Sequence, residues 1–158
     1  MLTINTNNSD RTKELGIDIG KLLSSGDIIC LSGDLGTGKT TFVNGLANGL
    51  EIKEYITSPT FTIVNEYVGK YKLYHFDVYR INDPEELYNI GFDEYIYSEA
   101  ISVIEWAELV SEIVPKEKLW IKITKNTDIS DEYRKFEIDS IGNRYELLIN
   151  ELIKRWTD

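Results

Sequence analysis

Residues 33–40 read Gly-Asp-Leu-Gly-Thr-Gly-Lys-Thr and match the pattern G-x-x-x-x-G-K-[ST] at every fixed position. Loops of this kind bind phosphates, because their backbone N–H groups converge on phosphate oxygens and glycine leaves room for that approach. On this interpretation Lys39 reaches the β- and γ-phosphates of a nucleotide, and the Thr40 hydroxyl binds Mg²⁺. The alternative is a glycine-rich turn with an exposed lysine. An apolar run before the loop and an amphipathic run after it favour the phosphate loop.

Two carboxylates follow apolar runs elsewhere in the chain. Asp77 comes after residues 73–76, and Glu105 comes after residues 101–104. Nucleotide hydrolysis needs a carboxylate near the metal and a group that orients the attacking water. The alternative for each residue is a solvated carboxylate at a strand end. A phosphate loop in the same chain favours the functional interpretation of both.

Three further features have a functional and a structural interpretation. Ser58-Pro59-Thr60 places two hydroxyls beside a stiff proline, which fits either a nucleotide-sensing switch loop or an ordinary proline turn. His75 is the only histidine, which excludes a zinc cluster built on histidines, and we predict a structural residue without a catalytic role. Cys30 is the only cysteine, which excludes an internal disulfide and indicates a buried structural thiol.

The elements that must position these residues follow from the hydrophobic pattern. Helical periodicity predicts helices over residues 9–23, 40–50, 85–89 and 141–156. Short apolar or alternating runs predict strands over residues 28–31, 61–68, 72–79, 101–104, 118–124 and 132–140. Ser9 is the expected N-cap of the first helix, and Gly69-Lys70 the expected turn of a hairpin. No repeat or linker interrupts the chain, so we expect a single domain over residues 1–158.

Charge and hydropathy exclude several classes of protein. The 158 residues carry a net charge of −10, which disfavours direct binding to a nucleic-acid backbone. Any link to RNA is therefore expected to run through partner proteins. The apolar runs are far shorter than the roughly 20 residues of a membrane span. The N-terminus lacks the basic start and apolar stretch of a secretory signal, so we expect a cytoplasmic protein.

Taken together, the motifs resemble those of the TsaE ATPases, which help to make the threonylcarbamoyladenosine modification of tRNA. The segments that carry the resemblance are LSGDLGTGKTTF, SPTFTIVNEY, LYHFDVYRI with the following DPEEL, and VIEWAE. They cover roughly residues 9–108, whereas the last third of the chain matches only in pattern. The resemblance implies an α/β P-loop NTPase fold: a three-layer sandwich around a central, mostly parallel sheet with antiparallel additions. It also implies ATP and Mg²⁺ as cofactors, and a TsaB–TsaD complex as the partner.

The resemblance also implies roles for individual residues. Asp77 and Glu105 lie in the region of the metal and the attacking water, and Thr60 is a switch position. The residues implied at the nucleotide itself are Gly36, Thr37, Gly38, Lys39, Thr40, Thr41 and Trp106, with Ser9 and Thr12 near the base and Arg134 near the phosphates. One departure is Ala107, where the family often has proline, and it leaves Glu105 and Trp106 in place.

Other nucleotide-binding classes share the loop. A small GTPase needs an N-K-x-D motif, which is missing, and the only D-x-x-G lies about a hundred residues after the loop, at residues 139–142. A nucleoside or metabolite kinase usually brings several arginines to the phosphates, and beyond Arg80 and Arg134 the middle and end of this chain offer few. A regulatory module that binds nucleotide and signals by shape is a third alternative.

Overall fold

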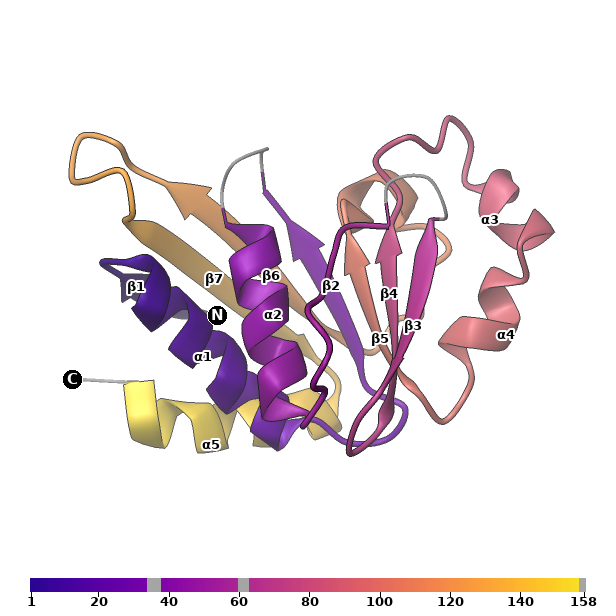
Figure 1. Cartoon of the computed structure of the whole chain (residues 1–158). Helices are drawn as coiled ribbons and strands as arrows, with labels where there is room; N and C mark the ends of the chain where they lie inside the picture. Colours follow the sequence, from indigo (N-terminus) through magenta and orange to yellow (C-terminus); the bar gives the residue numbers. More distant parts are fainter. Residues whose placement is uncertain (34–37, 60–62, 157–158) are drawn as a thin grey trace.

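The computed structural model describes residues 1–33, 38–59 and 63–156 (Figure 1). Its strands are β1 (Leu2–Thr6), β2 (Ile28–Ser32), β3 (Val64–Val68), β4 (Lys72–Asp77), β5 (Ile101–Glu105), β6 (Lys118–Lys125) and β7 (Arg134–Ile141). Its helices are α1 (Ser9–Leu22), α2 (Lys39–Gly49), α3 (Glu85–Asn89), α4 (Phe92–Ile96) and α5 (Asn143–Trp156), with a 3₁₀ turn η1 (Ala107–Val110). None of the helices in these three ranges is long and apolar enough to cross a membrane.

The strands form one sheet in the order β1-β7-β6-β2-β5-β4-β3. The four central strands, β6, β2, β5 and β4, pair in parallel, whereas β7, β1 and β3 pair antiparallel at the two sides. The expected parallel centre with antiparallel additions is therefore confirmed. Because the central strands run in parallel, their carboxyl ends meet at one edge, where α/β proteins bind ligands.

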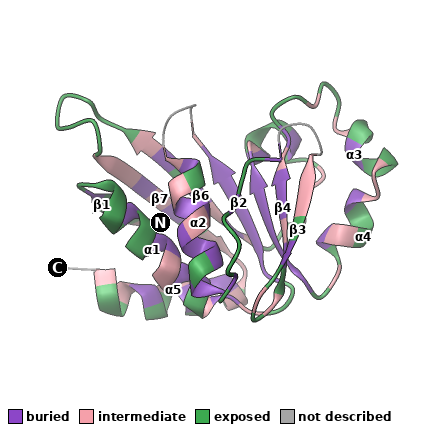
Figure 2. Cartoon of the chain, viewed as in Figure 1, coloured by how far each residue is buried: buried purple, intermediate pink, exposed green. Residues whose placement is uncertain are grey.

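Helices cover both faces of the sheet, as expected for a three-layer sandwich. Helices α1, α2 and α5 pack on one face, against apolar side chains such as Leu31, Val103 and Ile121. Helices α3 and α4 and the η1 turn pack on the other face, against Cys30 and Ile104. Every residue of β2 and β5 is buried, and both strands lie in the buried centre of the fold (Figure 2). This burial on both faces explains their uninterrupted apolar runs.

Most expected elements are confirmed within a few residues, and three details differ. Asn8, not Ser9, caps α1, because its side-chain oxygen accepts a hydrogen bond from the Arg11 N–H at 2.8 Å. Strand β1 and helix α4 were not expected, since a five-residue edge strand and a five-residue helix leave short patterns.

Cys30 is buried as expected, and burial raises the pKa of its thiol to about 12, which disfavours the reactive thiolate.

Helices α1 and α2 touch backbone to backbone. A Cβ added at Gly45 would lie 2.3 Å from the Lys13 carbonyl oxygen, and one at Gly16 would lie 2.5 Å from the Phe42 carbonyl oxygen. Gly20 and Gly49 make equivalent contacts one turn further along. Only glycine allows this separation, so the contact fixes α1 firmly against the helix that follows the phosphate loop.

We expect Gly45→Ala to lower the free energy of unfolding by about 2 kcal/mol, because the new methyl group must push the helices apart. The thermal midpoint should fall by roughly 4–8 °C in a chain of this size. Asn48→Ala is the control, since Asn48 is exposed on the same helix and should change the midpoint little. Equal midpoints for the two variants would show that the helix contact is not tight.

Candidate functional site

The predicted phosphate loop joins β2 to α2. Gly38 precedes α2 with φ +86°, a left-handed conformation that glycine adopts at little cost. Lys39–Thr41 form the first turn of α2, whose N–H groups have no acceptor within the helix and therefore suit an anion. The Thr40 side chain is exposed at this end of the helix. Gly36 and Thr37, also predicted to bind phosphate, lie outside the described residues.

The Lys39 side chain is buried and points back across the loop. Its Nζ donates a hydrogen bond of 2.8 Å to the Gly33 carbonyl oxygen and lies 3.6 Å from the centre of the Trp106 ring. The residue as a whole is only 6% exposed. The ammonium therefore sits on the face of an aromatic ring that the sequence places 67 positions away, which brings the end of β5 to the phosphate loop.

Trp106 is held in an unusual backbone conformation directly after β5. Its φ is +63°, in the left-handed region that non-glycine residues rarely adopt. Its ring packs against Tyr79 with the ring centres 4.6 Å apart. Such strain persists only where surrounding contacts enforce it, and it is common at functional sites. The structure thus places Trp106 beside Lys39, next to the predicted nucleotide site.

The two predicted carboxylates lie side by side. Asp77 ends β4, Glu105 ends β5, and the two residues are register partners in the parallel pair. Register partners in a sheet point to the same face, which here is the face that α2 covers. Glu105 is 4% exposed, whereas Asp77 is half-buried. The strand pairing therefore brings together two residues that are 28 positions apart.

The carboxylate of Asp77 is engaged by the segment that contains the predicted switch. One oxygen accepts a hydrogen bond from the Ser58 hydroxyl at 2.9 Å, and the other accepts one from the Tyr79 N–H at 3.0 Å. The Asp77 N–H donates to the Ile63 carbonyl oxygen, and Ile63 has φ +68°. Asp77 thus contacts the chain on both sides of Thr60, which itself lies outside the described residues.

His75 contacts Glu105, a placement that we did not expect from the sequence. The His75 Nε2 and the Glu105 Oε2 lie 2.5 Å apart, and both side chains are buried. His75 lies in the segment LYHFDVYRI, which carries the family resemblance, but neither that resemblance nor the pattern of the strand assigned the histidine a role. The structure adds His75 to the candidate site.

A small hollow of about 140 Å³ lies on the other side of the α2 N-terminus. Its lining brings together five residues predicted near the base and phosphates, with one acidic residue that the sequence did not indicate: Ser9, Thr12, Gly38, Thr41, Arg134 and Glu132. Thr12 is buried, and its hydroxyl lies 2.7 Å from that of Thr6. Glu132 belongs to the β6–β7 connection, which matches no motif. The hollow shows that α1 and the start of β7 flank Gly38 and the first turn of α2.

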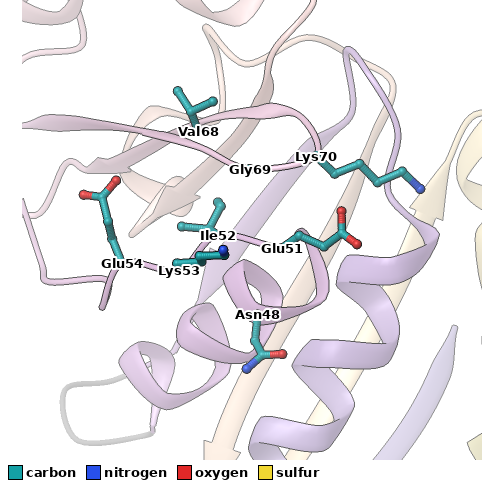
Figure 3. Close-up of a pocket in the computed structure, with 8 residues that line it drawn as sticks. All are labelled: Asn48, Glu51, Ile52, Lys53, Glu54, Val68, Gly69 and Lys70. Atoms are coloured by element: carbon teal, nitrogen blue, oxygen red, sulfur yellow. The ribbon is translucent and has the colours of Figure 1, made fainter.

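A larger hollow of about 860 Å³ lies at the opposite end of α2 (Figure 3). It is lined by the end of α2, the segment that follows it and the β3–β4 turn: Asn48, Glu51, Ile52, Lys53, Glu54, Val68, Gly69 and Lys70. None of the residues predicted to bind nucleotide or metal belongs to it. Because chemistry and not size defines a site, we assign the candidate site to the phosphate-loop end.

The donor groups at this end fit Mg²⁺ better than a metal held by a protein cage. Among the residues that the structure describes, no group of three or more histidine, cysteine, aspartate or glutamate side chains could hold a metal. Mg²⁺ usually takes one or two carboxylates, keeps several waters and uses phosphate oxygens of its substrate. The Thr40 hydroxyl with Glu105 or Asp77 supplies oxygen donors of that kind.

Comparison with known proteins agrees with this arrangement. The sequence model of the family described as threonylcarbamoyl adenosine biosynthesis protein TsaE matches residues 6–135. A Bacillus subtilis relative with the name tRNA threonylcarbamoyladenosine biosynthesis protein TsaE is 43% identical over 148 residues, or 93% of this chain and 90% of the relative. A Treponema pallidum protein of the same name is 45% identical over 112 residues, or 71% of this chain and 83% of that protein.

A solved structure extends the similarity to the whole fold. The crystal structure of Bacillus subtilis YdiB superimposes with a TM-score of 0.80 at 39% identity, and the match covers 97% of this chain and 94% of YdiB. The match includes the C-terminal third, which the quoted motifs do not reach. With the family match over most of the chain and this fold, the protein belongs to the TsaE family.

Proposed function

We propose that this chain is the ATP-hydrolysing subunit of the machinery that makes threonylcarbamoyladenosine in tRNA, and that it acts with a TsaB–TsaD complex. Membership of the TsaE family carries the role in this modification. The observation that carries the ATPase is the contact between Lys39 and Trp106. It brings the end of β5, with Glu105, to the phosphate loop at the start of α2.

Each side chain has a role in this proposal. Lys39 binds the β- and γ-phosphates, together with the first N–H groups of α2 and with Gly36 and Thr37 of the loop. Mg²⁺, held by Thr40 and a carboxylate, would neutralise charge on the phosphates during transfer to water. Glu105 is a buried carboxylate next to Trp106, whose ring contacts Lys39, and it serves the metal or the attacking water. Thr60 supplies the hydroxyl that reports whether the γ-phosphate is present.

Asp77 has a different task from Glu105 in this proposal. Both of its carboxylate oxygens already accept hydrogen bonds, from Ser58 and Tyr79. It therefore links the metal region to the segment around Thr60, so that a change at the phosphates alters the position of that segment. The Glu105 carboxylate contacts His75 through one oxygen, and among the described residues its other oxygen accepts no side-chain hydrogen bond, so Glu105 is the better candidate for a direct metal ligand.

The charge of the chain supports a division of labour with partners. A net charge of −10 opposes contact with the tRNA backbone, so the partner proteins would hold the tRNA. Since tRNA is the substrate, we place the reaction in the cytoplasm. The hollow beside the α2 N-terminus, with Ser9, Thr12 and Arg134, is proposed to receive the base side of the nucleotide.

Lys39→Ala and Glu105→Ala should separate binding from hydrolysis. We expect Lys39→Ala to weaken ATP binding roughly 10- to 100-fold, since it removes charge-assisted hydrogen bonds to phosphate. We expect Glu105→Ala to bind ATP but to lose at least about 100-fold in kcat, measured as phosphate release with TsaB–TsaD and tRNA present.

The matched controls are Lys53→Ala and Glu54→Ala, two exposed residues in the segment that follows α2. Normal hydrolysis by Glu105→Ala in the complete mixture would contradict its assignment. A phosphorylated small molecule in place of free phosphate would indicate a kinase. Unchanged modification of tRNA despite abolished hydrolysis would indicate a regulatory module that only binds nucleotide.

Nucleotide binding should also change the fluorescence of Trp106. A nucleotide offers the buried Lys39 ammonium several charge-assisted hydrogen bonds of about 1.5–3 kcal/mol each, in place of one desolvated cation–π contact of about 2 kcal/mol. Lys39 is therefore expected to leave the ring when ADP or ATP binds. A variant with Trp120→Phe and Trp156→Phe leaves Trp106 as the only tryptophan, and its emission should change saturably with nucleotide.

The control is the same titration on the single-tryptophan variant that also carries Lys39→Met. In that protein no ammonium contacts the Trp106 ring even before nucleotide is added. Binding is followed independently by calorimetry. Constant Trp106 emission at saturating nucleotide would mean that Lys39 stays on the ring and does not bind the phosphates.

A further inference from the structure

The contact between His75 and Glu105 is the least explained feature of the site. The two side chains are 1% and 5% exposed, and Nε2 and Oε2 are 2.5 Å apart. His75 lies in the interior of the sheet, with Asn65 of β3 and Val103 of β5 as its register partners. Because register partners point to the same face of the sheet, the side chains of Asn65 and Val103 flank the ring on that face. A buried histidine in this position can hold a carboxylate in one orientation.

The hydrogen-bond partners determine which ring nitrogen carries the proton. The Nδ1 of His75 is buried and has no hydrogen-bond partner among the described residues. In the part of the chain that the structure describes, the Ser102 Oγ is also buried without a partner, but it lies on the opposite face of the sheet, because Ser102 alternates with Val103. A proton on Nδ1 would leave a buried N–H without an acceptor, which is costly. The proton therefore belongs on Nε2, which donates to Glu105.

We propose that His75 is a positioning residue for Glu105. Its Nε2–H holds the Oε2 atom of Glu105 and thereby directs Oε1 towards the Mg²⁺ and phosphate region at the start of α2. This role rests on the proposed nucleotide site, but the hydrogen bond and its tautomer can be tested without turnover. A merely structural histidine would fill the same space without influencing what Glu105 binds.

Substitutions of similar size separate the two roles. His75→Gln keeps an N–H donor at a similar reach, and His75→Leu fills the space without a donor. We expect the wild-type protein, His75→Gln and His75→Leu to bind ADP equally in the absence of Mg²⁺. We expect the gain in ADP affinity on adding Mg²⁺ to fall roughly 10-fold in His75→Leu, and in Glu105→Gln, and to return within about 3-fold of wild type in His75→Gln.

Turnover should follow the same order. In the complete TsaB–TsaD and tRNA mixture, His75→Leu should lose kcat by at least 10-fold with little change in KM, and His75→Gln should recover most of it. Equal Mg²⁺-dependent affinity and equal kcat in His75→Leu and wild type would overturn the proposal. If wild type releases no phosphate at all, the proposed ATPase function fails, while the affinity measurements still decide the role of His75.

Because His75 is the only histidine, its imidazole gives a single set of ¹⁵N signals. We expect the wild-type spectrum, recorded without nucleotide or metal, to show the proton on Nε2, and we expect those signals to shift in Glu105→Gln. A proton on Nδ1 would overturn the proposal. This measurement needs no variant of His75, so it decides the question even if His75→Leu does not fold. In that case His75→Asn, whose donor falls short of Glu105, replaces it in the affinity comparison.

Discussion

The parallel pairing of β2, β5 and β4 is the constraint on which the candidate site depends. It places Leu31, Glu105 and Asp77 in register, so that three strands end together at one edge of the sheet. Parallel strands need long connections, and each connection here leaves from that same edge. The phosphate loop, the turn after Trp106 and the chain after Asp77 therefore begin next to one another. The pairing of the strands sets the proximity of these three segments, independently of any single side-chain contact.

Strained backbone and buried polar contacts concentrate at this edge. Trp106 and Ile63 both have positive φ. Trp106 directly follows Glu105 in the sequence, and the Ile63 carbonyl oxygen accepts a hydrogen bond from the Asp77 N–H. Lys39 and Glu105 are among the few buried charged side chains, and each has a defined partner within the site. Burying such groups costs free energy that packing elsewhere must offset. The apolar interiors of β2 and β5 supply that packing directly below the site.

Sequence and structure differ most where the signal is not local. The phosphate loop and α2 could be predicted because the motif, the preceding strand and the following helix are contiguous. Asp77 and Glu105 could be selected as candidates because each ends an apolar run. That they are register partners could not be predicted, since strand pairing is set by the whole sheet. His75 lies in a quoted segment that gave it no role and Glu132 in none, and only the fold shows that His75 contacts Glu105 and that Glu132 lines the hollow. Asn8 replaced Ser9 as the cap, because adjacent residues with similar capping preference cannot be ranked from sequence.

The glycine contact between α1 and α2 has a consequence for how nucleotide state can be transmitted. It joins α1, whose start lines the proposed base hollow, to α2, which carries Lys39. The residues proposed to contact the base and those proposed to contact the phosphates therefore belong to one rigid pair of helices. Binding of a nucleotide would then cost little free energy for ordering these residues, because they are already aligned. On the proposed ATPase function, a displacement that follows hydrolysis is therefore expected at the ends of β4 and β5, which the glycine contact does not hold.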